Sequence, residues 1–109
     1  MSGIEHVLNE LKKFRDEREW DQFHNSKDLA IAISIEASEL LELFLWKGNE
    51  EADPEKIKDE LADVMTFCLL LAEKHELDIT EIISEKIKKN AEKYPVGKAK
   101  GSARKYTEL

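Results

Sequence analysis

The sequence predicts an all-α fold, an antiparallel four-helix bundle that assembles as a homo-oligomer. Apolar residues recur at helical spacing in four successive segments. Only four glycines and two prolines interrupt the 109 residues, which favours long helices over many short strands. Short connections place neighbouring helices antiparallel, and about 100–150 residues is the usual size of one domain. We therefore expect one helical domain over residues 1–94, followed by a basic C-terminal tail at residues 95–109, which has no helical period.

The charge balance and the cysteine count narrow the class of protein. Charged residues make up 38% of the chain and hydrophobic ones 41%, a mix too apolar for a disordered chain. The net charge of -7 argues against nucleic acid as a partner. The single cysteine, Cys68, is interpreted as a small buried hydrophobe in a reducing compartment. Because no apolar run approaches the roughly 18–20 residues of a membrane span, and the N-terminal segment is charged, we expect no membrane partner and a cytoplasmic location.

The first two predicted helices cover residues 3–19 and 27–46. The apolar stripe of the first consists of Ile4, Val7, Leu8, Leu11 and Phe14. Asn25 or Ser26 is suited to cap the N-terminus of the second. The second helix is apolar around much of its circumference, as helices buried on all sides are. In so short a chain this predicts burial against another subunit, in a homodimer or a dimer of dimers.

Two further helices are predicted over residues 54–74 and 79–93. Asp53 is a typical N-cap, and Pro54 is a typical first residue of a helix. Pro95 follows the last predicted helix and ends it, because proline cannot continue the helical hydrogen bonds.

Four carboxylates interrupt the apolar stripes of the second and third predicted helices. Glu36 and Glu39 stand three residues apart, and so do Glu60 and Asp63, so each pair projects from one helix face. Antiparallel packing would let the pairs face each other. Ionised carboxylates in apolar surroundings are disfavoured unless paired or bound to a metal. Oxygen-only ligands select Mg²⁺ or Mn²⁺ over zinc, and Mg²⁺ so held usually meets substrate phosphates. The pattern predicts a metal site for phosphoanhydride hydrolysis, although Glu-x-x-Glu alone is common on helices.

The acidic pattern and its flanks resemble a known family. Glu36-x-x-Glu39 followed by Glu60-x-x-Asp63 is similar to the signature of the MazG-like all-α NTP pyrophosphohydrolase superfamily. The flanking segments resemble its dCTP pyrophosphatase branch, and they are EREWDQFH at residues 17–24, Leu45-Trp46-Lys47, NAEKYPV at residues 90–96 and KGSARKYT at residues 100–107. The resemblance extends from Phe14 to the end of the chain.

This resemblance implies an enzyme that hydrolyses (deoxy)nucleoside triphosphates, dCTP-like or modified, to the monophosphate and pyrophosphate in a house-cleaning role. Mg²⁺ or Mn²⁺ is the implied cofactor. The residues that match the metal ligands, and are expected to be catalytic, are Glu36, Glu39, Glu60 and Asp63. The sequence leaves open whether one of the glutamates instead orients or deprotonates the attacking water. Such a reaction needs mainly positioning and charge neutralisation.

The resemblance also implies which residues bind the nucleotide. Trp20 and Trp46 are expected to stack on the base or close over it, and His24 to contact base or phosphate. Further contacts are expected from the fourth helix and from the tail, either of the same chain or of a neighbouring subunit. These residues are Lys86, Asn90, Tyr94, Arg104 and Lys105. The basic tail would offset phosphate charge. For each residue alone, ordinary packing or a solvated salt bridge is the alternative.

Two positions depart from the dCTP pyrophosphatase branch. Leu11 stands where relatives can carry a histidine near the base, and Phe67 where a tyrosine is often found. Because neither side chain can hydrogen-bond a base, strict preference for cytosine is in question, while the chemistry of the carboxylates is unaffected.

Two other functions are compatible with the sequence. In the first, the chain is a non-catalytic helical interaction module whose acidic residues form salt bridges with the tail of another subunit. In the second, the same bundle hydrolyses other phosphate esters or pyrophosphates. Metal-dependent release of pyrophosphate from nucleotides distinguishes the enzyme from the module.

Overall fold

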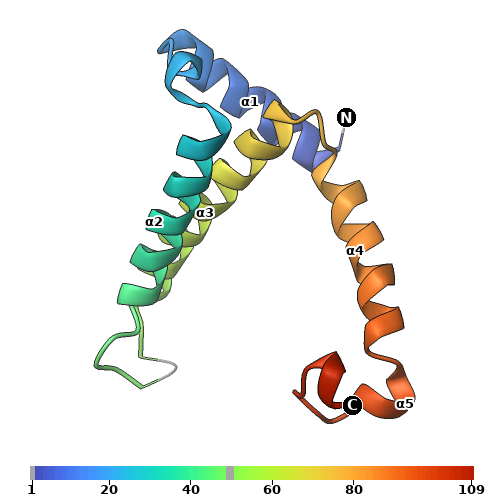
Figure 1. Cartoon of the computed structure of the whole chain (residues 1–109). Helices are drawn as coiled ribbons and strands as arrows, with labels where there is room; N and C mark the ends of the chain where they lie inside the picture. The colour runs from blue at the N-terminus through green and yellow to red at the C-terminus, as the bar shows by residue number, and fades with distance from the viewer. Residues whose placement is uncertain (1, 49–50) are drawn as a thin grey trace. The chain divides into compact units, whose positions relative to one another are not determined.

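Helices form the fold of the computed structural model, which describes residues 2–48 and 51–109. The elements are α1 (Gly3–Glu17), η1 (Asp21–Phe23), α2 (Ser26–Glu42), α3 (Pro54–Lys74), α4 (Ile79–Lys93), α5 (Val96–Ala99) and η2 (Tyr106–Glu108), where η marks a 3-10 turn (Figure 1). No strand occurs in the described residues, so the all-α prediction is confirmed. None of their helices is both long and apolar enough to cross a membrane. The chain divides into two compact units, Met1–Glu76 and Leu77–Leu109.

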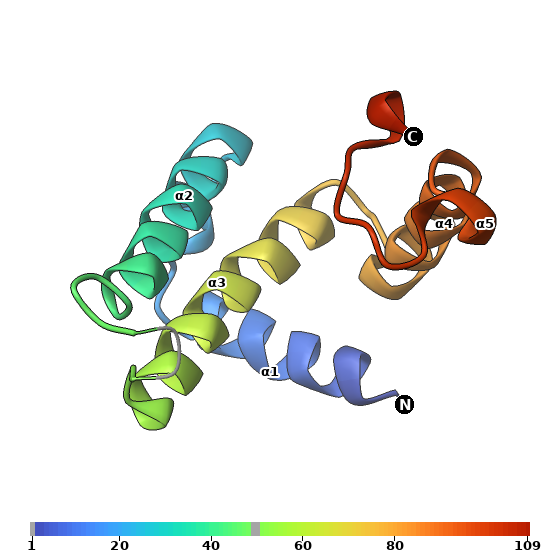
Figure 2. The same cartoon turned by 90° about the horizontal axis from the view of Figure 1, so that it is seen from below.

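In the first unit, α2 and α3 run side by side in opposite directions (Figure 2). Their N-termini are capped as predicted. The Asn25 side chain accepts a hydrogen bond from the backbone N–H of Asp28 at 2.9 Å. The Asp53 carboxylate accepts one from Glu55 at 3.0 Å, and Pro54 opens α3. Each cap satisfies a backbone donor that has no partner within the helix, so the caps define where the two helices begin.

The C-terminal end of α2 lies earlier than predicted. The helix ends at Glu42, and residues 43–46 form turns instead of a last helical turn. The backbone N–H groups of Leu43 and Phe44 bond three residues back rather than four, which tightens the chain. Trp46, four residues beyond this end, has a positive φ of 65°, a left-handed conformation through which a helix cannot continue. The predicted boundary at Trp46 is therefore wrong.

Helix α1 also ends two residues earlier than predicted, at Glu17 instead of Glu19. Glu19 has φ 55°, its N–H donates to the carbonyl of Asp16 at 3.0 Å, and the N–H of Trp20 donates to that of Arg15 at 3.1 Å. These two bonds around a left-handed residue form a Schellman motif, usually built on glycine. The motif turns the chain sharply, so Trp20 lies back against the end of its own helix.

The core of the first unit is small. Among the described residues, the buried apolar ones are Leu29, Ala52, Leu69, Leu70 and Ala72. Only 1% of Leu29 is exposed, whereas large apolar side chains elsewhere on α2, such as Ile31, Ile35 and Leu41, are exposed in this chain. The sides of α2 that the sequence predicts to be buried are thus not all covered within one chain.

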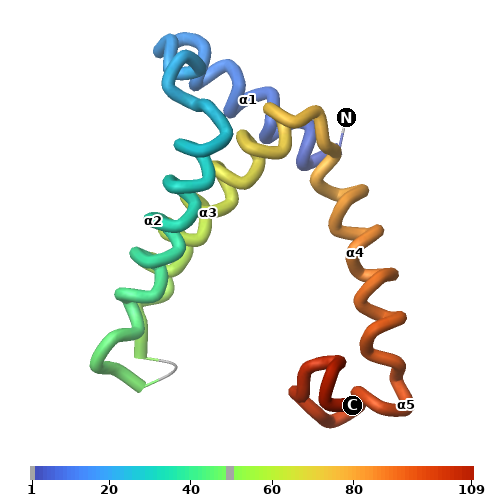
Figure 3. Tube along the Cα trace, in the orientation of Figure 1, coloured from blue at the N-terminus to red at the C-terminus, as the bar shows by residue number. Residues whose placement is uncertain are grey.

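The second unit is built on α4. Asp78 caps this helix by accepting hydrogen bonds from the N–H groups of Thr80 at 3.0 Å and Glu81 at 3.2 Å. After α5 the chain turns back (Figure 3), and the ring of Tyr106 meets Tyr94 edge-on at 6.0 Å. Residues 95–109 therefore contain short helical turns that the sequence pattern did not predict. Packing of α4 in a four-helix bundle stays a prediction, because the two units are described separately.

Candidate metal centre and adjoining cavity

Helices α2 and α3 bring three of the four predicted carboxylates together. One carboxylate oxygen from each of Glu36, Glu60 and Asp63 lies within 4.8 Å of the other two. Glu36 and Glu60 are half-buried, and Asp63 is exposed. Antiparallel packing produces this arrangement, because the face of α2 that carries Glu36 packs toward the face of α3 that carries Glu60 and Asp63. The result is a concentration of negative charge with room for a small cation.

The crowded carboxylates of this centre favour uptake of a proton or binding of a cation, either of which reduces their negative charge. Burial raises the pKa of Glu36 to about 7, and a hydrogen bond with Glu39 and the nearby carboxylate charges add to the effect. Burial, followed by the charge of Glu39, also raises the pKa of Glu60. The Oε2 atoms of Glu36 and Glu60 are buried and have no hydrogen-bond partner. Two unsatisfied carboxylate oxygens beside a third carboxylate fit a hard divalent cation such as Mg²⁺.

Glu39, the fourth predicted carboxylate, lies beside this group. It is half-buried on α2, and its charge is among the causes that raise the pKa of both Glu36 and Glu60. The compact group of possible ligand atoms contains Glu36, Glu60 and Asp63, without Glu39. The four residues therefore belong to one site, in which Glu36, Glu60 and Asp63 form the compact group and Glu39 lies next to it.

A cavity of about 250 Å³ adjoins the carboxylates. Residues of α1, α3 and the segment between α1 and α2 line it, namely Leu11, Phe14, Arg15, Trp20, His24, Asp63, Thr66, Phe67 and Leu70. Asp63 belongs both to this lining and to the acidic group, so the two features are continuous. A largely apolar cavity with a few polar groups is typical of small-molecule sites.

Aromatic rings form much of the cavity wall. The ring of Trp20 meets Phe14 edge-on at 5.6 Å, and the ring of His24 meets Phe67 edge-on at 6.5 Å. The Nδ1 atom of His24 is buried and has no hydrogen-bond partner. A buried ring nitrogen without a partner is costly unless a ligand supplies one. The wall therefore combines flat apolar surface with one unsatisfied polar atom. Leu11 and Phe67, the two departures noted in the sequence, both belong to it.

Sequence reasoning missed Arg15, Phe14, Thr66 and Leu70 as lining residues. For Arg15 a signal was available, since it follows Leu11 by four positions and Leu8 by seven. It thus continues the apolar stripe of α1, where a charged residue needs buried partners. For the other lining residues, membership depends on how α1 crosses α3, which no local pattern encodes.

The remaining predicted residues are not among those that line the cavity. Trp46 is fully exposed beyond the end of α2 and does not line the cavity. The others belong to the second unit, and they are Lys86, Asn90, Tyr94, Arg104 and Lys105. Among them Tyr94 is half-buried and the rest are exposed. Their contact with a nucleotide stays a prediction.

Fold and site together define an all-α protein with an acidic, oxygen-only centre beside an apolar cavity. The family model of the MazG-like family matches residues 31–109, a range that contains all four carboxylates. The chain belongs to the MazG-like family.

Three proteins whose names state an activity are similar to this chain. The dCTP pyrophosphatase 1 of Mus musculus is 36% identical over 114 residues, which cover 97% of this chain and 67% of the mouse protein. The dCTP pyrophosphatase 1 of Homo sapiens matches with the same identity and coverage. A crystal structure of a pyrophosphatase from Archaeoglobus fulgidus superposes with a TM-score of 0.82 at 36% identity, over 87% of this chain and 94% of that one. These relatives confirm the predicted resemblance and the predicted enzyme class, a nucleotide pyrophosphohydrolase.

Proposed function

We propose that this chain hydrolyses deoxynucleoside triphosphates, dCTP-like or modified, to the monophosphate and pyrophosphate, using Mg²⁺ or Mn²⁺. The observation that carries the proposal is the group formed by Glu36, Glu60 and Asp63, with its two unsatisfied buried oxygens and its position at the edge of the cavity. The names of the relatives, dCTP pyrophosphatase 1, support a nucleotide of this class.

The carboxylates divide the work of the reaction. Glu36, Glu60 and Asp63 hold the cation, because their oxygens form the compact group. When bound, Mg²⁺ neutralises triphosphate charge and lowers the pKa of water. Glu39 lies beside the ligands and is the group we assign to orient the attacking water and accept its proton. The helices hold these side chains in fixed positions, which suits phosphoryl chemistry that depends on positioning and charge.

The cavity takes the base. Pockets for drug-sized ligands measure about 300–1,000 Å³, so a cavity of about 250 Å³ suits a base and leaves the sugar and phosphates at the Asp63 edge. Trp20 offers a ring for stacking, a contact that any base can make. The Nδ1 atom of His24 supplies a hydrogen-bonding group. Because Leu11 and Phe67 cannot hydrogen-bond, the preference among bases is broad, and modified pyrimidines are included.

Residues outside the cavity complete the substrate site in this proposal. Trp46 closes over the nucleotide, and the residues of the second unit contact base edge and phosphates, as the family resemblance implies; these are Lys86, Asn90, Tyr94, Arg104 and Lys105. Replacement of Asn90 by alanine is expected to raise KM for dCTP. An unchanged KM would show that Asn90, and with it α4, does not contact the nucleotide.

The chain is also proposed to act as a homodimer or a dimer of dimers. The exposed apolar residues of α2, among them Ile31, Ile35 and Leu41, support this, because a second subunit would cover apolar surface that one chain leaves in contact with water. Light scattering at micromolar protein should give at least twice the chain mass of 12.6 kDa. A monomer mass would contradict the assembly without touching the chemistry.

Product analysis tests the reaction. Incubation with a panel of deoxynucleoside and ribonucleoside triphosphates should release pyrophosphate with Mg²⁺ and none with a chelator. Failure to turn over any nucleotide would contradict the proposal. The same panel, extended to other phosphate esters and pyrophosphates, would then distinguish a different hydrolase from a non-catalytic interaction module.

A further inference from the structure

Arg15 is buried in the cavity wall, although it is a long charged residue on a helix of an acidic protein. Only 8% of it is exposed. Arginine is almost never buried to this degree unless it is paired, so the partners of its guanidinium define its role.

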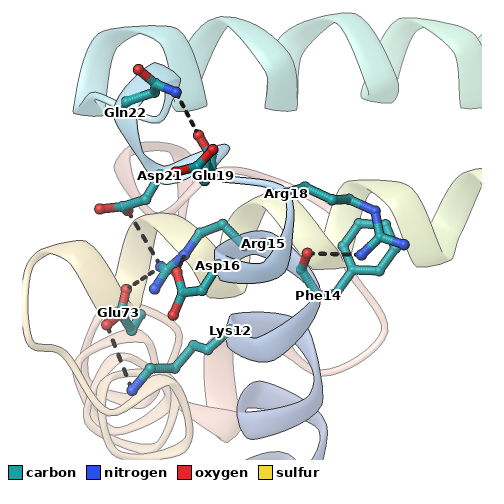
Figure 4. Close-up of polar contacts among 9 residues, drawn as sticks. All are labelled: Lys12, Phe14, Arg15, Asp16, Arg18, Glu19, Asp21, Gln22 and Glu73. Atoms are coloured by element: carbon teal, nitrogen blue, oxygen red, sulfur yellow. Dashed lines mark hydrogen bonds and ion pairs between the residues drawn. The ribbon is translucent and has the colours of Figure 1, made fainter.

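Those partners come from three elements (Figure 4). Nε donates to the Oδ1 atom of Asp16 on α1 at 2.8 Å, and Nη1 donates to the Oε2 atom of Glu73 near the end of α3 at 3.0 Å. Nη1 also lies 3.5 Å from Oδ1 of Asp21, the first residue of η1. The hydrogen bond with Asp16 raises the pKa of Arg15 despite burial and lowers that of Asp16, so the pair stays ionised. One side chain thus joins α1, α3 and the turn that follows α1.

The backbone of Arg15 holds the same segment. Its carbonyl accepts the hydrogen bond from the N–H of Trp20 at 3.1 Å. Within the turn, the side chain of Gln22 donates to the carbonyl of Glu19 at 2.8 Å (Figure 4). Glu19 itself is left-handed, a conformation that a non-glycine residue keeps only when its surroundings impose it. Arg15 supplies much of that restraint, from its side chain and from its carbonyl.

We propose that Arg15 is a positioning residue for the nucleotide base, because it fixes the Trp20–His24 segment against α1 and α3 and so sets the shape of the cavity. The inference rests on the proposed function, in which that cavity takes the base. Arg15 lies on α1, whereas the acidic group is formed by residues of α2 and α3. Its loss should therefore weaken substrate binding much more than it slows the chemical step.

Kinetics separate these two effects. Replacement Arg15→Met, which keeps the length of the side chain and removes the charge, is expected to raise KM for dCTP about tenfold with kcat within about twofold. Arg15→Lys should recover only part of the loss, because one ammonium group cannot match a guanidinium that meets three carboxylates. Lys13→Met, which removes an exposed charge from the same helix outside the cavity lining, is the control and should leave KM unchanged. An unchanged KM in Arg15→Met would overturn the proposal.

Fluorescence tests the same claim without turnover. In a Trp46→Phe background Trp20 is the only tryptophan. Adding Arg15→Met should increase quenching of Trp20 by acrylamide, and Lys13→Met should not. Asp21→Asn, which weakens only the 3.5 Å contact and spares the fold, should give a smaller increase in the same direction. Unchanged quenching in both Arg15→Met and Asp21→Asn would refute a positioning role, whether or not Arg15→Met lowers stability. If the wild type hydrolyses no nucleotide, the proposed function fails, and quenching still decides the role of Arg15.

Discussion

Replacing Glu36 with glutamine tests how strongly the carboxylates of the acidic centre repel one another when no metal is bound. Glutamine keeps the size of the side chain and removes one of three charges that lie within 4.8 Å of one another. At that distance two unit charges repel by about 1 kcal/mol in water and about 3.5 kcal/mol at an effective dielectric constant near 20. Because Glu36 and Glu60 are only half-buried and Asp63 is exposed, the lower value applies. We expect Glu36→Gln to relieve about 1 kcal/mol for each pair that involves Glu36.

The effect depends on pH in a definite direction. Burial, with help from Glu39 and the other carboxylates, raises the pKa of Glu36 from 4.5 to about 7 in the folded protein. The folded state therefore holds this proton more tightly than the unfolded chain does. Without metal, the contribution of Glu36 to stability is therefore greatest below pH 4.5 and is lost as the pH rises through about 7. At pH 8 Glu36→Gln should melt at least about 4 °C above the wild type. At pH 4 the two should melt close together, because Glu36 is then mostly protonated in both the folded and the unfolded state.

Thermal unfolding followed by circular dichroism measures these differences, with chelator and with Mg²⁺. Mg²⁺ should stabilise the wild type more than Glu36→Gln, because ligand binding to the folded state alone raises stability and the variant lacks a ligand. Glu42→Gln removes an exposed carboxylate at the end of the same helix and is the matched control. Identical melting of wild type and Glu36→Gln at pH 8 without metal, together with equal responses to Mg²⁺, would refute the reasoning.

Three further changes have expected outcomes. Leu29→Ala, at a core position that is 1% exposed, should lower the unfolding free energy in urea by about 2–5 kcal/mol, and a loss within experimental error would show that α2 and α3 do not pack as described. Glu19→Gly should raise the free energy of unfolding by about 0.5–1 kcal/mol, because glycine adopts the left-handed φ of 55° without strain. A lower stability would contradict that conformation. Trp20→Ala should raise KM for dCTP about tenfold through loss of stacking, while Phe23→Ala, its exposed aromatic neighbour outside the lining, should not; equal effects would place the base elsewhere.

The elements of this fold could be predicted where local chemistry decides them. The Asp53-Pro54 pair defined the start of α3, and the bounds of α4 at Ile79 and Lys93 were predicted correctly. The helix ends at Glu17 and Glu42 were not, because left-handed Glu19 and Trp46 carry no glycine signal. The pattern of apolar residues continues past both positions, so helical periodicity alone does not show where either helix ends.

The candidate site divides in the same way. The carboxylates were recognisable because Glu36 and Glu60 interrupt apolar stripes, and the structure gathers both with Asp63. The cavity was not recognisable as a whole, since it forms where α1, α3 and the turn after α1 meet. Arg15 shows the reason, because its three carboxylate partners include Glu73, which is 58 positions away in the sequence. No local spacing brings such groups together.

The measurement that tests the central claim most directly is the identity of the products. Wild-type protein incubated with dCTP and Mg²⁺ should yield dCMP and pyrophosphate in equal amounts, and Glu36→Gln should yield neither at a comparable rate. Release of dCDP and inorganic phosphate, or turnover that persists unchanged in Glu36→Gln or with a chelator, would contradict a metal-dependent pyrophosphohydrolase built on this acidic centre.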